Sequence, residues 1–330
     1  MRNFKKVIVW GYPLYSHTHS FIHYGWYKAF KSLGYETYWF HDGEFPESFD
    51  YSDALFITEG YADKNIPLVK GSTYFVHIAK DPAKYLEAEC RLIDVRFNLK
   101  KTKDYSYDYT RPDGELVKLD CFSLYERNAN DSALVDKYRK GVKGYEAVYM
   151  FWATDFLPSE IDLTSAFIDR SKTVYHVGSF WSANRKELLT LQEALSRKGV
   201  SFEIRDPWKR ITTNEEAIKL IQQSYIAPDI RGSGATCDEA SAEESNHLTN
   251  GYIPCRIFKN ISYGQLGMTN SPSVNELMGD YVIFSRDIEE LVEKAEPYRK
   301  DYNKIIESMD YVKNNHTFVN RIQAILQILQ

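Results

Sequence analysis

Short apolar runs that alternate with helix-like segments constrain this chain most strongly. The run KKVIVW at 5–10 predicts a strand, and a turn at Gly11-Tyr12-Pro13 follows it. A helix is expected from Ser20 to Leu33, where aromatic residues recur at roughly helical spacing. A strand at 35–40 then completes a β-α-β unit. Such a unit requires parallel strands with a covering helix, so we expect an α/β fold.

The same pattern continues along the first half of the chain. Short apolar runs at 54–58, 73–78 and 147–152 predict further strands of a parallel sheet. Residues 98–125 interrupt the pattern because they are polar and rich in tyrosine. Pro112-Asp113-Gly114 is a turn signal between two strand-like runs. We therefore expect a hairpin inserted into the first domain.

A second α/β unit begins near residue 172. Strands are expected at 173–177, 202–206 and 225–230, and the helices between them at 184–198 and 215–223. The 330 residues suit two domains of this kind. We expect the first domain to cover 1–158 and the second 159–310. Residues 311–330 read as a final helix.

Composition excludes several classes of protein. The net charge is −5, so nothing global indicates binding to nucleic acid. No long apolar run predicts a transmembrane helix or a signal peptide. The four cysteines form no CxxC pair, which argues against a zinc site and favours a reduced, cytoplasmic protein.

The segment YIPCRIFKNISYGQLGMTN at 252–270 gives the strongest functional signal. It predicts a helix, a glycine turn and a short strand, and Arg256 and Lys259 share one face of that helix because they are three residues apart. A helix start presents unpaired N–H groups and the positive end of its dipole. Together these groups favour binding of a phosphate or a diphosphate.

Other residues are expected beside this phosphate site, at the carboxyl ends of strands in the second domain. Glycine lets a phosphate approach the backbone, arginine binds it with two N–H groups, and hydroxyl or amide side chains bind a sugar or a phosphate. Trp208 follows a strand where a base commonly lies, although packing under a loop explains it equally well. Asn270 and Ser271 equally suit a helix cap. The expected donor site comprises Gly178, Ser179, Arg185, Trp208, Arg231, Arg256, Lys259, Asn270 and Ser271.

A catalytic base is expected in the first domain. His17, His19 and His23 lie in the first loop and the start of the following helix, and histidine suits proton transfer near neutral pH. His19 and His17 are the favoured candidates, with Glu59 at a strand end as the alternative. Asp81 and Asp155 are further carboxylate candidates. No third metal ligand has a clear spacing from the histidines, so no metal site is expected.

Several common motifs are absent from the sequence. The first loop reads GYPLYSHTH rather than GxGxxG, which argues against a dinucleotide oxidoreductase. Neither a P-loop nor a GxSxG elbow occurs.

The second half of the chain resembles glycosyltransferases of the GT-B type. The resemblance rests on VYHVGSFWSANRKELL, EEAIKLIQQSYIAPDIRG, and CRIFKNISYGQLGMTNSPSVNELMGDYVIF followed by DIEELVEKA, all within 173–295. It implies two Rossmann-like domains facing a cleft, with a nucleotide-sugar donor on the second domain and a glycan or other hydroxyl acceptor on the first. It also implies a C-terminal helix that crosses back to the first domain and a reaction that needs no metal or cofactor.

One departure bears on the stereochemistry. Retaining group 1 enzymes carry two glutamates seven residues apart around this helix, whereas this chain has Lys259 and no such pair. We therefore expect an inverting hexosyl- or deoxyhexosyltransferase. A nucleotide-sugar 2-epimerase with the same architecture and a non-catalytic protein that binds sugar nucleotides or glycans remain the alternatives.

Overall fold

The computed structural model describes residues 4–96, 106–110, 116–120, 136–139, 145–206, 211–235 and 246–329. Its contacts divide the chain into two compact units. The first unit comprises Met1–Phe151 and Phe318–Gln330, and the second comprises Trp152–Thr317. The expected division placed these junctions at 158–159 and 310–311, whereas the contacts place them at 151–152 and 317–318.

The first unit is built on a seven-stranded sheet in the order β2-β1-β3-β4-β5-β9-β8. All neighbouring strands run parallel except the β8–β9 pair at one edge. This arrangement confirms the expected α/β class and is Rossmann-like. The strands are β1 (Lys6–Trp10), β2 (Glu36–Phe40), β3 (Ala54–Glu59), β4 (Thr73–His77), β5 (Arg91–Arg96), β8 (Asp136–Arg139) and β9 (Tyr145–Tyr149).

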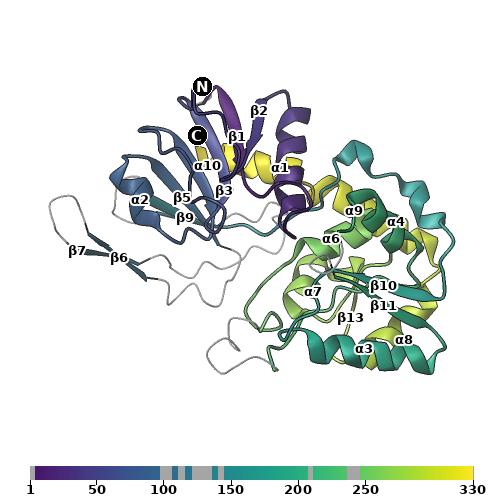
Figure 1. Cartoon of the computed structure of the whole chain (residues 1–330). Coiled ribbons are helices and arrows are strands. Elements are labelled where there is room, and N and C mark those ends of the chain that lie inside the picture. Colours follow the sequence, from purple (N-terminus) through teal and green to yellow (C-terminus); the bar gives the residue numbers. More distant parts are fainter. Residues whose placement is uncertain are drawn as a thin grey trace. The chain divides into compact units, whose positions relative to one another are not determined.

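Three described helices accompany this sheet: α1 (Ser20–Ser32), α2 (Pro82–Glu87) and α10 (Phe318–Leu329). The α1 helix buries Trp26, whose ring lies 4.6 Å from the ring of Phe318 in α10. Arg321 of α10 is fully buried and donates from Nε to the carbonyl oxygen of Phe151, 3.0 Å away. The helix from the end of the chain is thus fixed to the end of the sheet strand β9 (Figure 1).

The core on one face of this sheet is strongly aromatic. Phe56 of β3 and Tyr74 of β4 are fully buried and stack at 4.4 Å, and Tyr85 of α2 packs against Tyr74. Burial of each such ring stabilises the fold by about 2 kcal/mol relative to an exposed ring. The central strands β1, β3 and β4 bury successive residues on both faces of the sheet, as expected for a parallel sheet covered on both sides.

The predicted insertion contains an antiparallel hairpin, as expected. Its strands are β6 (Ser106–Thr110) and β7 (Leu116–Asp120), paired from Ser106–Asp120 to Thr110–Leu116. The turn at 112–114 and the rest of the tyrosine-rich stretch lie outside the described residues.

The second unit contains two pairs of parallel strands, joined by the segment 225–230. The pairs are β10 (Thr173–Val177) with β11 (Ser201–Arg205), and β12 (Met268–Thr269) with β13 (Ile283–Phe284). Tyr225 N–H donates to Thr173 O at 2.8 Å, and Asp229 forms a parallel bridge with Thr269. The segment 225–230 therefore lies between β10 and β12 and connects the two pairs of strands.

The expected strand at 225–230 is not a regular strand, which corrects the prediction. The N–H of Tyr175 in β10 donates to Ser224 Oγ at 3.0 Å. A side-chain oxygen thus replaces the backbone carbonyl that would accept this bond in a regular strand pair. Pro228 in the middle of the segment has no N–H to donate. A small cavity lined by His176, Pro228 and Arg256, among others, lies where regular pairing is lost.

Helices cover both faces of these strands. In Figure 1, α3 and α8 lie on one face, and α4, α6 and α9 lie on the other. The helices are α3 (Arg185–Arg197), α4 (Asn214–Gln223), α6 (Cys255–Ser262), α7 (Pro272–Met278), α8 (Ile288–Ala295) and α9 (Tyr302–Asn315), and the short 3-10 turns are η2 (Pro158–Glu160), η3 (Leu163–Phe167), η4 (Gly279–Tyr281) and η5 (Glu296–Tyr298).

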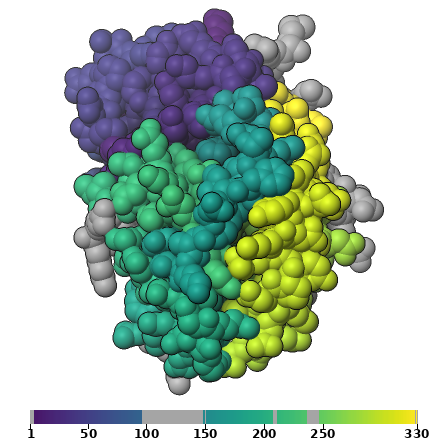
Figure 2. Space-filling view, turned by 90° about the vertical axis from the view of Figure 1, so that its right-hand side faces the viewer, coloured from purple at the N-terminus to yellow at the C-terminus, as the bar shows by residue number. Residues whose placement is uncertain are grey.

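Residues 152–172, which precede β10, belong to the second unit. This segment contains η2 and η3, and the ring of Phe167 in η3 lies 4.9 Å from that of Tyr302 in α9. In the space-filling view these two segments, teal and yellow, lie side by side (Figure 2). Across the described part of the chain, no helix has the length and apolar character needed to cross a membrane.

Candidate functional site

The first candidate site gathers histidines around a buried carboxylate in the first unit. Glu59 is the last residue of β3 and is 2% exposed, and His77 is the last residue of the neighbouring strand β4. His19 and His23 come from the start of α1, which follows β1. Because parallel strands end at the same edge of a sheet, this topology collects residues that are distant in sequence.

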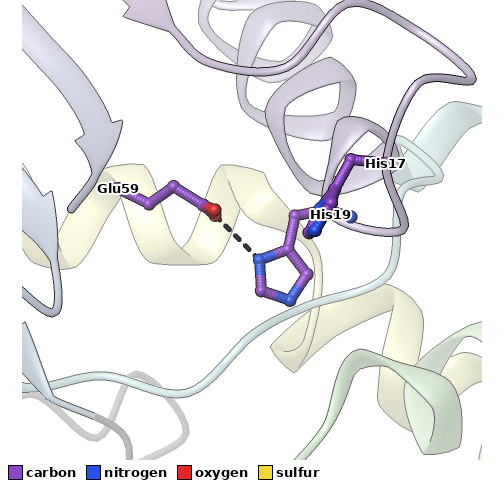
Figure 3. A group of neighbouring side chains, drawn as sticks. All are labelled: His17, His19 and Glu59. Carbon is purple, nitrogen blue, oxygen red and sulfur yellow. Dashed lines mark hydrogen bonds and ion pairs between the residues drawn. The ribbon is translucent and has the colours of Figure 1, made fainter. Parts of the chain in front are cut away.

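Glu59 accepts hydrogen bonds on this edge. His19 Nδ1 lies 2.8 Å from Glu59 Oε2, and His23 Nε2 lies 3.5 Å from the same oxygen. His23 Nδ1 accepts the backbone N–H of Tyr12 at 3.0 Å, so its proton is on Nε2 and faces Glu59. Figure 3 shows Glu59 reaching from one side and His17 and His19 from the start of α1 on the other.

The protonation states follow from burial and from these contacts. Burial favours the neutral form of Glu59, but the hydrogen bond from His19 and the nearby histidines outweigh it and lower the pKa of Glu59 to about 2. Burial lowers the pKa of His23 to about 4, although the charge of Glu59 opposes this shift. Burial and the charge of Glu59 raise the pKa of Tyr12 to about 12. At neutral pH the site therefore holds an ionised Glu59 beside a neutral His23.

The backbone around this site leaves no room for larger side chains. A Cβ at Gly11 would lie 2.2 Å from His23 Nδ1, and a Cβ at Gly60 would lie 2.1 Å from the carbonyl oxygen of Ile78. Ile78 has a φ of 54°, which is strained for a β-branched residue and directly follows His77. Strain of this kind commonly marks functional sites, where the surrounding structure holds it in place.

This arrangement suits His19 to act as a general base. Its side chain is 34% exposed, and the carboxylate of Glu59 holds its Nδ1–H. That bond leaves the lone pair on Nε2 and stabilises the imidazolium that forms when a proton is taken up. Although His17, His19 and Glu59 were each predicted as candidates, only the structure joins them. His77 was missed, and its position at a strand end, like that of Glu59, was the available signal.

The two other carboxylates considered as bases have structural partners. Asp81 caps α2 by accepting the N–H of Lys84 at 3.4 Å. Asp155 accepts the hydroxyl of Tyr263 at 2.6 Å and lies 3.4 Å from Lys259 Nζ.

The second candidate site, here called the arginine site, comprises Gly178, Arg231 and Arg256 in the second unit. Gly178 follows β10 and has a φ of 152°, which favours glycine. A Cβ at this position would lie 2.1 Å from Arg256 Nη2, so the guanidinium packs directly on the backbone. Arg256 also donates from Nη1 to the carbonyl oxygen of Val177 at 2.7 Å. Arg256 stands in the first turn of α6, whose first turn contains no acidic residue.

Arg231 follows the segment 225–230 and is held from two sides. Its Nη2 donates to the carboxylate of the buried Asp229. Its backbone N–H and carbonyl oxygen both bond to the side-chain amide of Asn270, at 2.7 and 3.0 Å. Only 11% of the Arg231 side chain is exposed. The two hydrogen bonds with Asn270 therefore fix the position of this part-buried cation.

Positive charge exceeds its local compensation at the arginine site. Burial, and then the charge of Arg231, lower the pKa of Arg256 to about 10. Burial and the same two arginines hold the pKa of His176 well below its usual range. The buried Nε atoms of both arginines have no hydrogen-bond partner among the described residues. Two part-buried cations with unpaired Nε–H groups form a site suited to an anion.

The remaining predicted donor residues have varied positions. Lys259 is paired with Asp155, and Ser271 caps α7 by accepting the N–H of Val274 at 3.4 Å. Arg185 is exposed at the start of α3, 5.5 Å from the ring of Phe180. The carbonyl oxygen of Ser179 accepts Asn184 Nδ2 at 3.1 Å, which closes the loop before α3. Trp208 lies outside the described residues.

Comparisons with known proteins give no assignment for this chain. No protein-family model matches it, and a search of curated proteins finds no match.

The buried His23 generates a test of the electrostatics at this site. Its folded pKa of about 4 lies below its ordinary value of 6.5, so as the pH falls the unfolded chain binds a proton that the folded chain does not. Stability is therefore lost as the pH falls below 6.5. Between pH 7 and pH 5 His23 should contribute a loss of about 2 kcal/mol in the free energy of unfolding. Urea denaturation of wild type and His23→Asn should show this excess loss in the wild type alone. Equal pH dependence of the two proteins would contradict the assignment.

Proposed function

We propose that this protein is a glycosyltransferase that moves a sugar from a nucleoside diphosphate sugar to a hydroxyl acceptor, with inversion at the anomeric carbon. The second unit binds the donor, and the first unit activates the acceptor. Two α/β units, the first of them Rossmann-like, and a final helix that belongs to the first unit support the proposal of a GT-B architecture. The free thiols of Cys90 and Cys255 suit a reducing, cytoplasmic setting.

The single observation that carries the proposal is the arginine site. Arg231 and Arg256 place two guanidinium groups at the carboxyl ends of parallel strands, and among the described residues Asp229 is the carboxylate that pairs with Arg231. Gly178 leaves the space in which the Arg256 guanidinium packs against the backbone, so this cation is held beside the end of β10. The carboxyl edge of an open parallel sheet is where such folds bind their ligands. A diphosphate, with two negative groups, matches two fixed cations better than a neutral ligand does.

The same cations suit the chemistry of transfer. When the bond from the anomeric carbon to the diphosphate breaks, the electron pair goes to the phosphate oxygen and negative charge develops there. Arg231 and Arg256 would stabilise this charge, and they are already held in place by Asn270 and by the carbonyl oxygen of Val177. Charges that are positioned before the reaction require little rearrangement in the transition state.

His19, paired with Glu59, would deprotonate the acceptor hydroxyl. His19 Nε2 would take the proton of the acceptor hydroxyl as the acceptor oxygen forms its bond to the anomeric carbon. Glu59 would stabilise the resulting imidazolium through the 2.8 Å bond to Nδ1. Direct attack by the acceptor from the face opposite the leaving diphosphate inverts the configuration.

Replacement of Arg256 tests donor binding. Arg256→Ala should weaken binding of the preferred nucleoside diphosphate roughly 10- to 100-fold, because it removes a charge-assisted contact to phosphate. Isothermal titration of both proteins measures the effect. Arg197→Ala, which removes an exposed arginine paired with Glu289 on the same unit, is the matched control and should bind as wild type does. An affinity that is unchanged in Arg256→Ala would remove this residue from the site.

Replacement of His19 tests the catalytic step. His19→Ala should lower donor turnover about 100-fold or more while leaving nucleoside diphosphate affinity unchanged, because a general base contributes to the transition state. Release of nucleoside diphosphate from the sugar donor, with and without glycan acceptors, gives the rate. His41→Ala, a histidine of the same unit that pairs with Glu44, is the control.

Three outcomes of this assay would contradict the proposal. An equal loss of turnover and affinity in His19→Ala would assign His19 to folding. Conversion of the donor sugar without transfer would indicate an epimerase. Binding without any turnover would indicate a protein that only binds sugar nucleotides.

A further inference from the structure

We propose that His17, His19 and Glu59 form a binding site for a divalent transition-metal ion of the zinc type, and that the bound ion silences the base. The site stands on the arrangement of these three side chains alone. Its effect on turnover rests on the proposed function.

The three side chains already lie at near-ligand separation. Their donor atoms, one from each residue, are all within 4.8 Å of one another. The donor atoms of a tetrahedral zinc ion lie about 3.3 Å apart, as follows from bonds of about 2.0–2.1 Å. His19 Nδ1 and Glu59 Oε2, at 2.8 Å, are already closer than this. Small side-chain rotations would thus suffice to bring all three atoms onto one ion.

His17 is oriented for this role by two contacts. Its Nδ1 accepts the backbone N–H of His19 at 3.1 Å, which makes Nε2 the atom that it would offer. Its ring stacks on Tyr12 with centroids 4.0 Å apart and planes at 26°. A ligand that is held before binding loses less conformational entropy on binding. In Figure 3 the His17 side chain lies beside that of His19 at the start of α1.

The charge of the group suits a dication. Glu59 supplies a carboxylate oxygen, and His17 and His19 each supply an imidazole nitrogen. Neutral imidazoles and one carboxylate are the protein ligands of many catalytic zinc sites. Binding therefore displaces at most the proton that His19 shares with Glu59.

Outer contacts would hold the carboxylate in position. His23 Nε2 lies 3.5 Å from Glu59 Oε2, and the N–H of Tyr12 fixes the tautomer of His23. Partners of this kind orient the direct ligands of a metal and tune its affinity. Three protein ligands leave one coordination position to water or to a substrate hydroxyl.

The ion and the base compete for the same atoms. An ion bound to Nδ1 of His19 replaces the proton that this atom donates to Glu59. An ion bound to Nε2 instead occupies the lone pair that would take the proton from the acceptor hydroxyl. In either case the His19–Glu59 pair no longer acts as a base. A zinc-loaded protein is therefore the inactive form.

The test measures metal binding by the full chain without any substrate. Chelator-treated protein is titrated with Zn²⁺ by calorimetry and with Co²⁺ by visible absorbance, which reports the ligand geometry. We expect about one equivalent to bind, with affinity falling at least tenfold in His17→Ala and in Glu59→Gln. His41→Ala is the matched control, because His41 and Glu44 form another histidine–glutamate pair on the same unit, 3.7 Å apart. It should bind as wild type does.

Each outcome decides the proposal. No binding by wild type, or undiminished binding by both His17→Ala and Glu59→Gln, would overturn the site. Urea denaturation of each variant, with the His17→Phe variant as a second replacement that retains an aromatic ring, separates loss of ligand from loss of fold.

Turnover separates this proposal from the proposed function. Zinc that binds but leaves donor turnover unchanged would overturn the inhibitory role and keep the site. Zinc that binds to a protein with no turnover on any donor would keep the site while the transferase proposal fails.

Discussion

The second unit holds two part-buried guanidinium groups, Arg231 and Arg256, close enough to repel each other, and this constrains the residues around them. Arg256 lies in the electric field of Arg231, and the described structure compensates the pair mainly through Asp229. The surrounding residues hold both cations where they stand: the Asn270 amide clamps the backbone of Arg231, and Gly178 gives Arg256 its place against the strand end. Holding two like charges together costs stability unless an anion relieves it. This geometry is what supports the proposal of an anionic ligand.

The first unit contains a cluster of histidines around a carboxylate. A single buried carboxylate, Glu59, organises His19 and His23 through one oxygen atom. One arrangement can serve two purposes, because a histidine–carboxylate pair takes up either a proton or a metal ion. If His19 is the base and the site binds zinc as proposed, the ambient zinc concentration sets how much of the protein is active.

The sequence predicted most of the strands and helices, for identifiable reasons. Apolar runs and glycine turns indicated the strands and helices, and Arg256 stood out because it begins a helix. What failed depended on partners distant in sequence. The pairing of Lys259 with Asp155 and the use of Asn270 as a clamp arise only when the chain folds. The segment 225–230 has the composition of a strand, but the Ser224 side chain and Pro228 interrupt its ladder. Nor could spacing along the sequence join His19 to Glu59, because the order of parallel strands brings them together.

The most direct test of diphosphate binding at the arginine site compares three ligands that share one base. Isothermal titration of the full chain with the nucleoside, its monophosphate and its diphosphate, repeated for uridine, guanosine, adenosine and thymidine, isolates the contribution of the phosphates. The account predicts that, for one base, the diphosphate binds at least about tenfold more tightly than the monophosphate and that added salt weakens binding, because two cations meet two anionic groups. Equal affinity for nucleoside and diphosphate, or no binding by any of them, would contradict it.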